Sequence, residues 1–311
     1  MSSGILTQMK ILVSGSHGLV GKALVHSLTE DGHEVIRLVR GEHALGAPEV
    51  GWQPQQGRID VEHLEGIHAV VHLAGENIAS GRWSAEKKRA IRESRVKGTA
   101  LLSDALAQLS RPPSVFLSAS AIGYYGDRGD ELLTEESAPG KDFLSSVCKE
   151  WEAATRPAVE KRIRTVYTRF GIILDPDEGA LGKMLPPFRM GVGGRVGDGK
   201  QWMSWIALED VVNGLKFLIE DESIKGPVNF VAPEPVRNAE FTKTLGRVLN
   251  RPTLFPIPAF GARLAFGEMA DALLLSSQKV DPSVLEDKGF MFTWPTLEPT
   301  LRHLLAADER G

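Results

Sequence analysis

Three glycines stand near the start of the chain, between an apolar strand pattern and an amphipathic helix pattern. Residues 11–13 are aliphatic, Gly15, Gly18 and Gly21 follow, and the helix pattern runs through Leu28. The first glycine permits a sharp turn, the second lets the backbone approach a pyrophosphate, and the third lets helix and strand pack closely. Free N–H groups at the helix start also favour an anion. A plain strand-to-helix turn is the alternative, but the flanking strand and helix favour a dinucleotide. The residues that we predict to bind it are Gly15, Ser16, His17, Gly18, Leu19, Val20 and Gly21.

The end of the second strand indicates which dinucleotide is bound. An acidic residue there would bind the ribose hydroxyls of NAD. The strand over residues 34–40 instead ends on Arg40, whose guanidinium suits a 2′-phosphate. The alternative is that Arg37 and Arg40 are solvated charges. We predict NADP, and regard NAD as the lesser alternative.

Composition limits the class of protein. The 311 residues are 42% hydrophobic and 24% charged, as in a globular protein, and the net charge of −4 argues against a nucleic-acid partner. The one cysteine, Cys148, allows no intrachain disulfide, which fits a reducing compartment. No secretory signal and no apolar run long enough to span a bilayer is visible. We therefore expect a cytoplasmic protein without a membrane partner.

Strand and helix patterns alternate through the first half of the chain. Strand patterns cover 34–40, 68–73, 114–120 and 165–170, a long helix is expected over 84–107 with Ser84 as its cap, and another over 141–159. Such alternation predicts an α/β, doubly wound parallel sheet with helices on both faces. From about residue 175 glycines crowd the chain and strands become brief. We predict a nucleotide-binding domain over 9–175 and a smaller, irregular substrate lobe over 176–311, with some of its segments returning to the sheet.

Several motifs resemble the extended short-chain dehydrogenase/reductase superfamily, and within it an epimerase-like branch. They are the glycine triplet, the turn Leu73-Ala74-Gly75 with Glu76-Asn77-Ile78, the segment Val147–Glu152, and the stretch from Gly191 through Gln201-Trp202-Met203-Ser204-Trp205-Ile206. The resemblance also covers the C-terminal region, from Gly289-Phe290-Met291-Phe292 to Leu305. It implies a Rossmann-type fold, and it implies that Leu73, Ala74 and Gly75 contact the cofactor.

The superfamily uses a tyrosine, a lysine four residues later on one helix face, and a serine from the preceding strand. The resemblance assigns the lysine to Lys149, which would also hold the cofactor ribose, and the serine to Ser118 or Ser120. The tyrosine position is Ser145, a departure that matters because a serine hydroxyl is too weak an acid without a neighbouring base.

Two other residue types are candidates for the missing group. Tyr124 and Tyr125 lie where the superfamily often carries a Tyr-Gly pair, and Tyr124 is our substitute candidate, although packing against cofactor or substrate is the more ordinary role. A nucleophilic Cys148 is the less favoured hypothesis. Cys148 is adjacent to Lys149 in sequence, and adjacent residues of a helix do not lie on the same face; a single buried cysteine is also usually inert.

The second lobe is expected to line a substrate pocket between the lobes. Arg169 and Lys183 are candidates for holding an anionic group. For the aromatic residues Phe188 and Trp205, the alternative is that they belong to the hydrophobic core of the second lobe. No metal site is expected, since His68 and His72 lie too far apart on a strand for one ion. The predicted substrate residues are Arg169, Lys183, Met184, Phe188, Gln201 and Trp205.

We therefore expect an NADP(H)-binding oxidoreductase or epimerase-like enzyme, monomeric or homodimeric, that acts on a small carbonyl or hydroxyl compound, sugar-like or anionic. The alternative is an NADP(H)-binding sensor whose catalytic site has degenerated. The serine at position 145 favours the sensor, and the matched Lys149 and serine positions favour the enzyme.

Overall fold

A computed structural model describes residues 8–41 and 48–308 of the chain. One eight-stranded sheet dominates it, in the order β12-β8-β6-β5-β1-β2-β3-β4. All neighbouring strands are parallel except β3 and β4. The strands are β1 (Lys10–Ser14), β2 (Glu34–Arg40), β3 (Glu49–Gln53), β4 (Arg58–Ile59), β5 (Ala69–His72), β6 (Val115–Ala121), β8 (Arg164–Phe170) and β12 (Gly226–Phe230). The predicted α/β class is confirmed.

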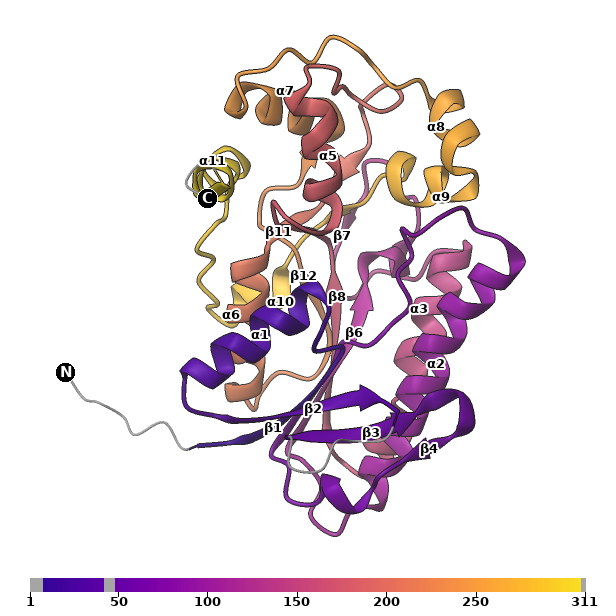
Figure 1. Ribbon diagram of the computed structural model, residues 1–311, viewed down its shortest axis with the longest axis vertical. Coiled ribbons are helices and arrows are strands. Elements are labelled where there is room, and N and C mark those ends of the chain that lie inside the picture. Colours follow the sequence, from indigo (N-terminus) through magenta and orange to yellow (C-terminus); the bar gives the residue numbers. More distant parts are fainter. Residues whose placement is uncertain (1–7, 42–47, 309–311) are drawn as a thin grey trace, which may run out of the picture.

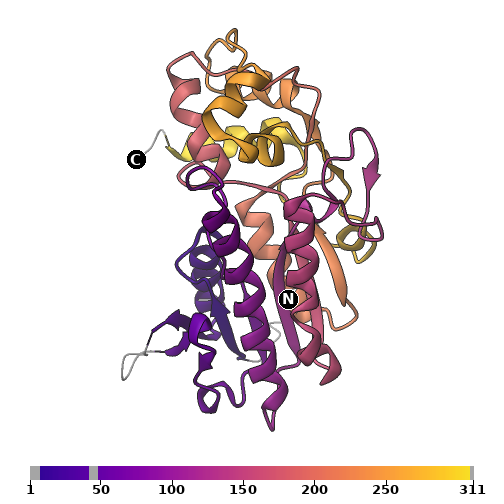
Figure 2. The same cartoon turned by 90° about the vertical axis from the view of Figure 1, so that its right-hand side faces the viewer.

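Helices cover both faces of the sheet, because its strands carry apolar side chains on both faces. On one face α1 (Leu19–Glu30) and α6 (Leu208–Glu220) bury leucines and valines against β1, β5 and β12. On the other, α2 (Ala85–Gln108) and α4 (Arg156–Glu160) pack on Trp52 and Phe116. Figure 1 shows α2 and α3 (Phe143–Ala153) on the side of the sheet opposite α1 and α6, and Figure 2 shows the same layers turned by 90°.

The helix expected over 141–159 is two helices in the structure. α3 ends at Ala153 and α4 begins at Arg156, with Pro157 in its first turn. Proline has no N–H for the bond to residue 153 and its ring crowds that carbonyl, so one continuous helix is disfavoured. The predicted cap of α2 is confirmed, since Ser84 accepts a hydrogen bond from the backbone N–H of Lys87.

The remaining elements form a smaller layer beyond the carboxyl ends of the sheet strands (Figure 1). Its core is built from apolar residues of α5, α7 and α11 around Trp205. Its helices are α5 (Gly179–Arg189), α7 (Asn238–Val248), α8 (Ala259–Phe266), α9 (Glu268–Ala270) and α11 (Leu297–Asp308), whereas α10 (Ser283–Asp287) packs on β12 of the main sheet. Its strands pair as β9 (Ile172–Leu174) with β11 (Trp205–Ala207), β10 (Trp202–Met203) with β13 (Val236–Arg237), and β7 (Leu132–Leu133) with β14 (Lys279–Val280).

Short helical turns complete the structure, at Pro54–Gln56 (η1), Glu62–Leu64 (η2), Ile122–Tyr125 (η3) and Asp271–Leu275 (η4). The domain boundary predicted at residue 175 stays a prediction, although α6 and β12 follow it in sequence and join the main sheet. Within residues 8–41 and 48–308, no helix is long and apolar enough to cross a membrane.

Candidate functional site

The glycine turn between β1 and α1 has the geometry that a bound phosphate requires. Gly15 has a φ of +67°, and a Cβ there would lie 2.8 Å from the backbone of Leu73. A Cβ on Gly21 would lie 2.2 Å from the carbonyl oxygen of Gly15. Gly18 caps α1 without a side-chain bond, and the first turn carries no acidic residue, so its N–H groups and positive dipole end face no competing carboxylate from that turn.

Ser16 provides an independent indication of a ligand at this turn. Its hydroxyl is buried and has no hydrogen-bond partner among the described residues, and the residue is only 4% exposed. A buried polar group without a partner is costly, so such groups in folded proteins normally bond to protein, water or ligand. Of the seven residues predicted from the glycine spacing, Gly15, Ser16, His17 and Gly18 precede α1, and Leu19, Val20 and Gly21 form its first turn.

The turn after β5 is held against the glycine turn by Ser14. The Ser14 hydroxyl oxygen accepts the N–H groups of Leu73 and Ala74 at 3.0 and 3.2 Å, and lies 2.6 Å from Nδ1 of His72. With both lone pairs occupied, Ser14 donates its proton to Nδ1, so Nε2 carries the ring proton and donates to Thr99 at 2.9 Å. Burial lowers the pKa of His72 to about 4, which keeps the ring neutral. The predicted cofactor residues Leu73 and Ala74 thus lie beside Gly15.

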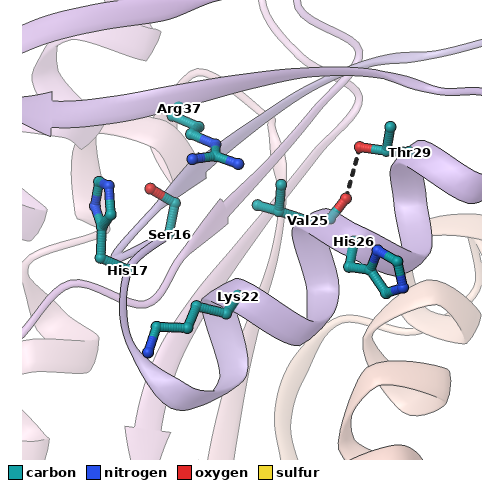
Figure 3. A pocket seen from close by; sticks show the side chains of 7 residues that line it. All are labelled: Ser16, His17, Lys22, Val25, His26, Thr29 and Arg37. Atoms are coloured by element: carbon teal, nitrogen blue, oxygen red, sulfur yellow. Dashed lines mark hydrogen bonds between the residues drawn. The ribbon is translucent and has the colours of Figure 1, made fainter.

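A cavity of about 330 Å³ opens between α1 and β2, next to the glycine turn. Figure 3 shows Arg37 above it and the side chains of α1 below. Its lining residues are Ser16, His17, Lys22, Val25, His26, Thr29 and Arg37. Arg40, predicted to bind a 2′-phosphate, is exposed at the end of β2, whereas Arg37 lines the cavity with three other nitrogen-bearing side chains. Sequence reasoning missed Lys22 and His26, although both lie on the polar face of α1 beside the turn.

Gly75 packs directly on a half-buried cation, Arg95, that sequence reasoning did not identify. A Cβ on Gly75 would lie 3.2 Å from the guanidinium carbon of Arg95. Arg95 donates to the carbonyl oxygens of Glu76 and Ile91 at 3.0 and 3.2 Å, and its guanidinium lies 5.0 Å from the ring centre of Trp151. Arg95 therefore brings a positive charge to the carboxyl end of β5.

Lys149 does not lie on the face of α3 that meets the end of β6, and its predicted catalytic role stays a prediction. Lys149 is exposed on α3, whereas Cys148 is 4% exposed and its Sγ lies 4.0 Å from a Cβ built on Gly123. Leu144, one turn earlier, lies 3.3 Å from the same Cβ. Each residue advances a helix by about 100°, so the pair facing the end of β6 is Leu144 and Cys148. Burial raises the pKa of Cys148 to about 12, so this face carries a neutral thiol instead of a lysine.

Ser145, which stands four residues before Lys149, has a local structural role. Its Oγ lies 3.0 Å from both Oδ1 of Asp142, the N-cap of α3, and the carbonyl oxygen of Gly123. The residue is completely buried. It therefore ties the start of α3 to η3.

Of the two predicted serines on β6, Ser118 and Ser120, the second belongs to a buried charge network. Ser120 donates to Glu152 at 2.8 Å, and Glu152 accepts two further bonds from Arg169 at 2.8 and 2.9 Å. Ser118 is 1% exposed and its hydroxyl has no partner among the described residues. Glu152 was missed from the sequence, although it follows Cys148 at helical i, i+4 spacing.

Arg169 is committed to this network, which corrects its prediction as an anion-binding substrate residue. It is 3% exposed, pairs with Glu152, and donates through Nη1 to the Tyr125 hydroxyl at 3.0 Å. Its guanidinium also stacks 3.6 Å from the ring centre of Tyr124. The Tyr125 hydroxyl donates a hydrogen bond to the side-chain oxygen of Asn229 at 2.7 Å. Tyr124 is half-buried and packs on Arg169, whereas the packing against cofactor or substrate that the sequence favoured stays a prediction.

The other predicted substrate residues do not gather in one place. Phe188 and Trp205 are buried in the core of the second layer, with the Trp205 indole donating to the carbonyl oxygen of Glu234 at 3.0 Å. Gln201 is 7% exposed and lines a separate cavity of about 570 Å³ that also contains Asp130 and Arg237. The structure therefore corrects the predicted pocket roles of Phe188 and Trp205: both serve as core residues.

Lys183 and Met184 lie on α5, close to the segment that follows β5. Lys183 donates to the carbonyl oxygen of Ala79 at 3.1 Å, and Met184 is half-buried beside it on α5. The start of α5 meets α1, where Lys22 pairs with Glu178 at 2.7 Å. Within the described residues, no group of three His, Cys, Asp or Glu side chains is placed to hold a metal ion.

Comparison with known proteins identifies the family. Residues 11–231 match the NAD dependent epimerase/dehydratase family. The chain belongs to that family. Residues 257–304 match a domain of unknown function, DUF1731, so this family member carries an additional C-terminal region.

Relatives of this epimerase/dehydratase family member match over nearly their full length. An epimerase family protein of Mycobacterium tuberculosis is 43% identical over 291 residues, covering 94% of this chain and 96% of that protein. Human epimerase family protein SDR39U1 is 34% identical over 301 residues, covering 96% of this chain and 100% of that protein.

Two solved structures, one of them of the same human relative, have the same fold. The human protein crystallised with NADPH superposes with a TM-score of 0.87 at 32% identity, covering 96% of this chain and 99% of that one. A nucleoside-diphosphate sugar epimerase from Corynebacterium glutamicum gives 0.78 at 37% identity, covering 97% of this chain and 59% of that one. The predicted Rossmann-type fold and the predicted superfamily are confirmed.

Proposed function

We propose that this protein binds NADP(H) at the glycine turn and acts as an oxidoreductase or epimerase-like enzyme on a small carbonyl or hydroxyl compound. The observation that carries the cofactor proposal is the buried, partnerless Ser16 hydroxyl beside a helix start without a competing carboxylate. Backbone N–H groups of the turn would hold the pyrophosphate, and Leu73 and Ala74 would flank it. The human relative that was crystallised with NADPH supports the same choice.

Preference for the phosphorylated cofactor is assigned to the side chains around the cavity beside β2. Arg37 and Lys22 line it, and Arg40 follows Arg37 three residues later on the same strand. Guanidinium groups bind phosphate through two parallel charge-assisted hydrogen bonds, so these arginines favour a 2′-phosphate over a ribose hydroxyl.

The reacting group would lie at the carboxyl ends of β5 and β6. When bound, the nicotinamide supplies or accepts a hydride. Ser120 donates its only proton to Glu152, so its free lone pairs accept a hydrogen bond from a substrate hydroxyl. Arg95 places its positive charge beside Gly75, where it stabilises negative charge that develops on a substrate oxygen. Tyr124 is the proton-carrying group in this proposal, because its half-exposed ring is held in place by Arg169.

A turnover assay tests this assignment. NADPH oxidation is followed with a panel of small aldehydes, ketones and keto sugars, and Tyr124→Phe is expected to lower kcat by about 100-fold or more. Tyr167→Phe is the matched control, because the Tyr167 hydroxyl already accepts a hydrogen bond from Thr155 at 3.2 Å. Equal rates for the two variants would contradict the role of Tyr124.

A substitution in the glycine turn tests cofactor binding separately. Gly21→Ala places a methyl group 2.2 Å from the Gly15 carbonyl and is expected to weaken NADPH binding by at least about 100-fold. Gly261→Ala is the control, because its Cβ would meet only Pro258, at an ordinary 3.4 Å. Unchanged affinity in Gly21→Ala would refute the site.

A second function, an NADP(H)-binding sensor, is favoured by the face of α3 that meets β6. That face presents Leu144 and the neutral thiol of Cys148, and neither side chain is an acid at neutral pH. A sensor binds NADPH, shows no turnover with any compound of the panel, and changes in thermal stability on binding. The predicted cytoplasmic location and the monomeric or homodimeric state also remain proposals.

A further inference from the structure

Exposed apolar side chains concentrate at one end of the molecule. Of the eleven large apolar side chains that are exposed in the described part of the chain, eight come from residues 190–192 and 254–266. They are Met190, Val192, Leu254, Phe255, Ile257, Phe260, Leu264 and Phe266. The two segments lie side by side, because Ile257 donates to the carbonyl oxygen of Arg195 and its own carbonyl oxygen accepts from Gly197. We name this area, with the arginines described next, the tip surface.

The tip surface is also basic. Residues 189–197 and 251–267 contain four arginines and no aspartate or glutamate, although the whole chain has a net charge of −4. Arg195 and Arg251 donate to the backbone carbonyl oxygens of Asp198 and Arg189, so among the described residues no carboxylate pairs with either. Arg263 pairs with Asp271 at 2.9 Å. Apolar side chains and arginines therefore share one surface, and the two segments that form it contain no aspartate or glutamate.

The side chains of the tip surface protrude. Leu254, Phe260 and Leu264 are 78%, 73% and 77% exposed, which side chains inside a concave substrate pocket would not be. Phe260 and Leu264 lie one helical turn apart on α8, so they project together. In Figure 1 α8 and the segment leading to it lie at the end of the molecule opposite β2–β4, and Figure 2 shows the same placement.

We propose that the tip surface docks this protein on an anionic lipid surface. Phenylalanine and leucine side chains insert at the boundary of headgroups and acyl chains, while neighbouring arginines pair with lipid phosphates. Pro252, Pro256 and Pro258 lack backbone N–H groups, so this irregular segment has fewer donors to leave unpaired in that environment. The proposal does not depend on the proposed cofactor.

Two other occupants fit the tip surface less well. A second copy related by two-fold symmetry would place the same patch against itself, and Arg195 and Arg251 would then face like charges. A protein partner would need a shape-complementary acidic groove, whereas a lipid surface accommodates separate protruding side chains without one. The expectation of no membrane partner was based on spanning segments along the chain, and it does not address a surface built from two distant segments.

Vesicle flotation of the full-length protein tests the proposal. We expect binding to vesicles of equal parts phosphatidylglycerol and phosphatidylcholine, weaker by at least about tenfold for phosphatidylcholine alone, and decreasing with added salt. Phe260→Ser with Leu264→Ser, and separately Arg195→Gln with Arg251→Gln, are each expected to weaken binding by about tenfold or more.

Matched controls remove similar groups elsewhere. Met291→Ser removes an apolar side chain that is 87% exposed, and Lys161→Gln with Lys225→Gln removes two exposed charges; both should bind like the unmodified protein. Phe260→Trp, which keeps the patch apolar, should show fluorescence quenching by brominated acyl chains, and it tests the proposal even if the serine variants fail to fold.

Several outcomes would overturn the proposal. They are absence of vesicle binding, equal binding to both vesicle types, equal effects of patch and control substitutions, and no quenching of the new tryptophan. Self-association in sedimentation that Phe260→Ser abolishes, without vesicle binding, would assign the tip surface to a second copy instead.

Discussion

The Arg169–Glu152 pair offers a sharp test of how the end of β6 is held. Their side chains are 3% and 11% exposed, and two hydrogen bonds of 2.8 and 2.9 Å join them. Glu152→Gln removes the negative charge and leaves the Arg169 guanidinium buried without compensation. Breaking a buried pair in this way costs about 3–5 kcal/mol, because the remaining charge loses its counterion but stays out of water.

Differential scanning calorimetry measures this loss. We expect Glu152→Gln to lower Tm by roughly 5–10 °C. The control is Glu160→Gln, which breaks the exposed Arg156–Glu160 pair, whose side chains are 80% and 68% exposed. That change is expected to cost at most about 0.5 kcal/mol.

A second substitution distinguishes charge from packing. Adding Arg169→Met to Glu152→Gln removes the uncompensated cation and is expected to recover part of the lost stability. If Glu152→Gln shifts Tm no more than Glu160→Gln does, or if the double variant is less stable than Glu152→Gln alone, the reasoning on this network is refuted.

Three further predictions concern titration and the face of α3. Burial lowers the pKa of His72 in the folded state to about 4, below the ordinary 6.5. Its contribution to the free energy of unfolding is therefore complete above pH 6.5 and is lost as the pH is lowered toward 4. We expect denaturant titrations to show a loss of about 2 kcal/mol between pH 6.5 and 5. Lys149→Ala is expected to leave NADPH affinity and turnover unchanged, because Lys149 is exposed and the face of α3 that meets the end of β6 carries Leu144 and Cys148 instead. Cys148 should react with a thiol reagent only after unfolding, because burial raises its pKa to about 12.

Each of these has a result that contradicts it. An NMR titration that shows His72 gaining a proton near pH 6.5, the ordinary value for a histidine, would contradict its neutral state in the fold. A large loss of turnover in Lys149→Ala would restore the role that its sequence position implies. Labelling of Cys148 in the native protein as fast as in urea would show that the thiol is accessible.

The sheet and the nucleotide turn could be predicted from sequence because both depend on local patterns. Strand and helix periodicity fixes which segments form layers, and the need for glycine at position 21 is local, because a Cβ there would meet Gly15. At position 15 the contact that requires glycine comes from Leu73, on another strand end, but the glycine spacing already indicated the turn. The helix expected over 141–159 ran through Pro157, and the split into α3 and α4 was missed. Proline is tolerated in the first turn of a helix, so Pro157 marks the start of a new helix, α4.

The catalytic face could not be predicted because it depends on how α3 is rotated against β6. A shift of one residue rotates the side chains by about 100°, and spacing alone does not distinguish Lys149 from Cys148. Arg169 was misassigned for a similar reason. Its partner Glu152 and the Tyr125 hydroxyl come from other elements, and only the fold shows that its charge is already neutralised.

The most direct test of the account is a calorimetric titration of the protein with NADPH and with NADH. The glycine turn and the arginines beside it predict NADPH binding at least about tenfold tighter than NADH binding, and an Arg37→Ala/Arg40→Ala variant that loses this preference while retaining NADH affinity. Equal affinity for the two cofactors, or no binding of either, would contradict the assignment of this turn.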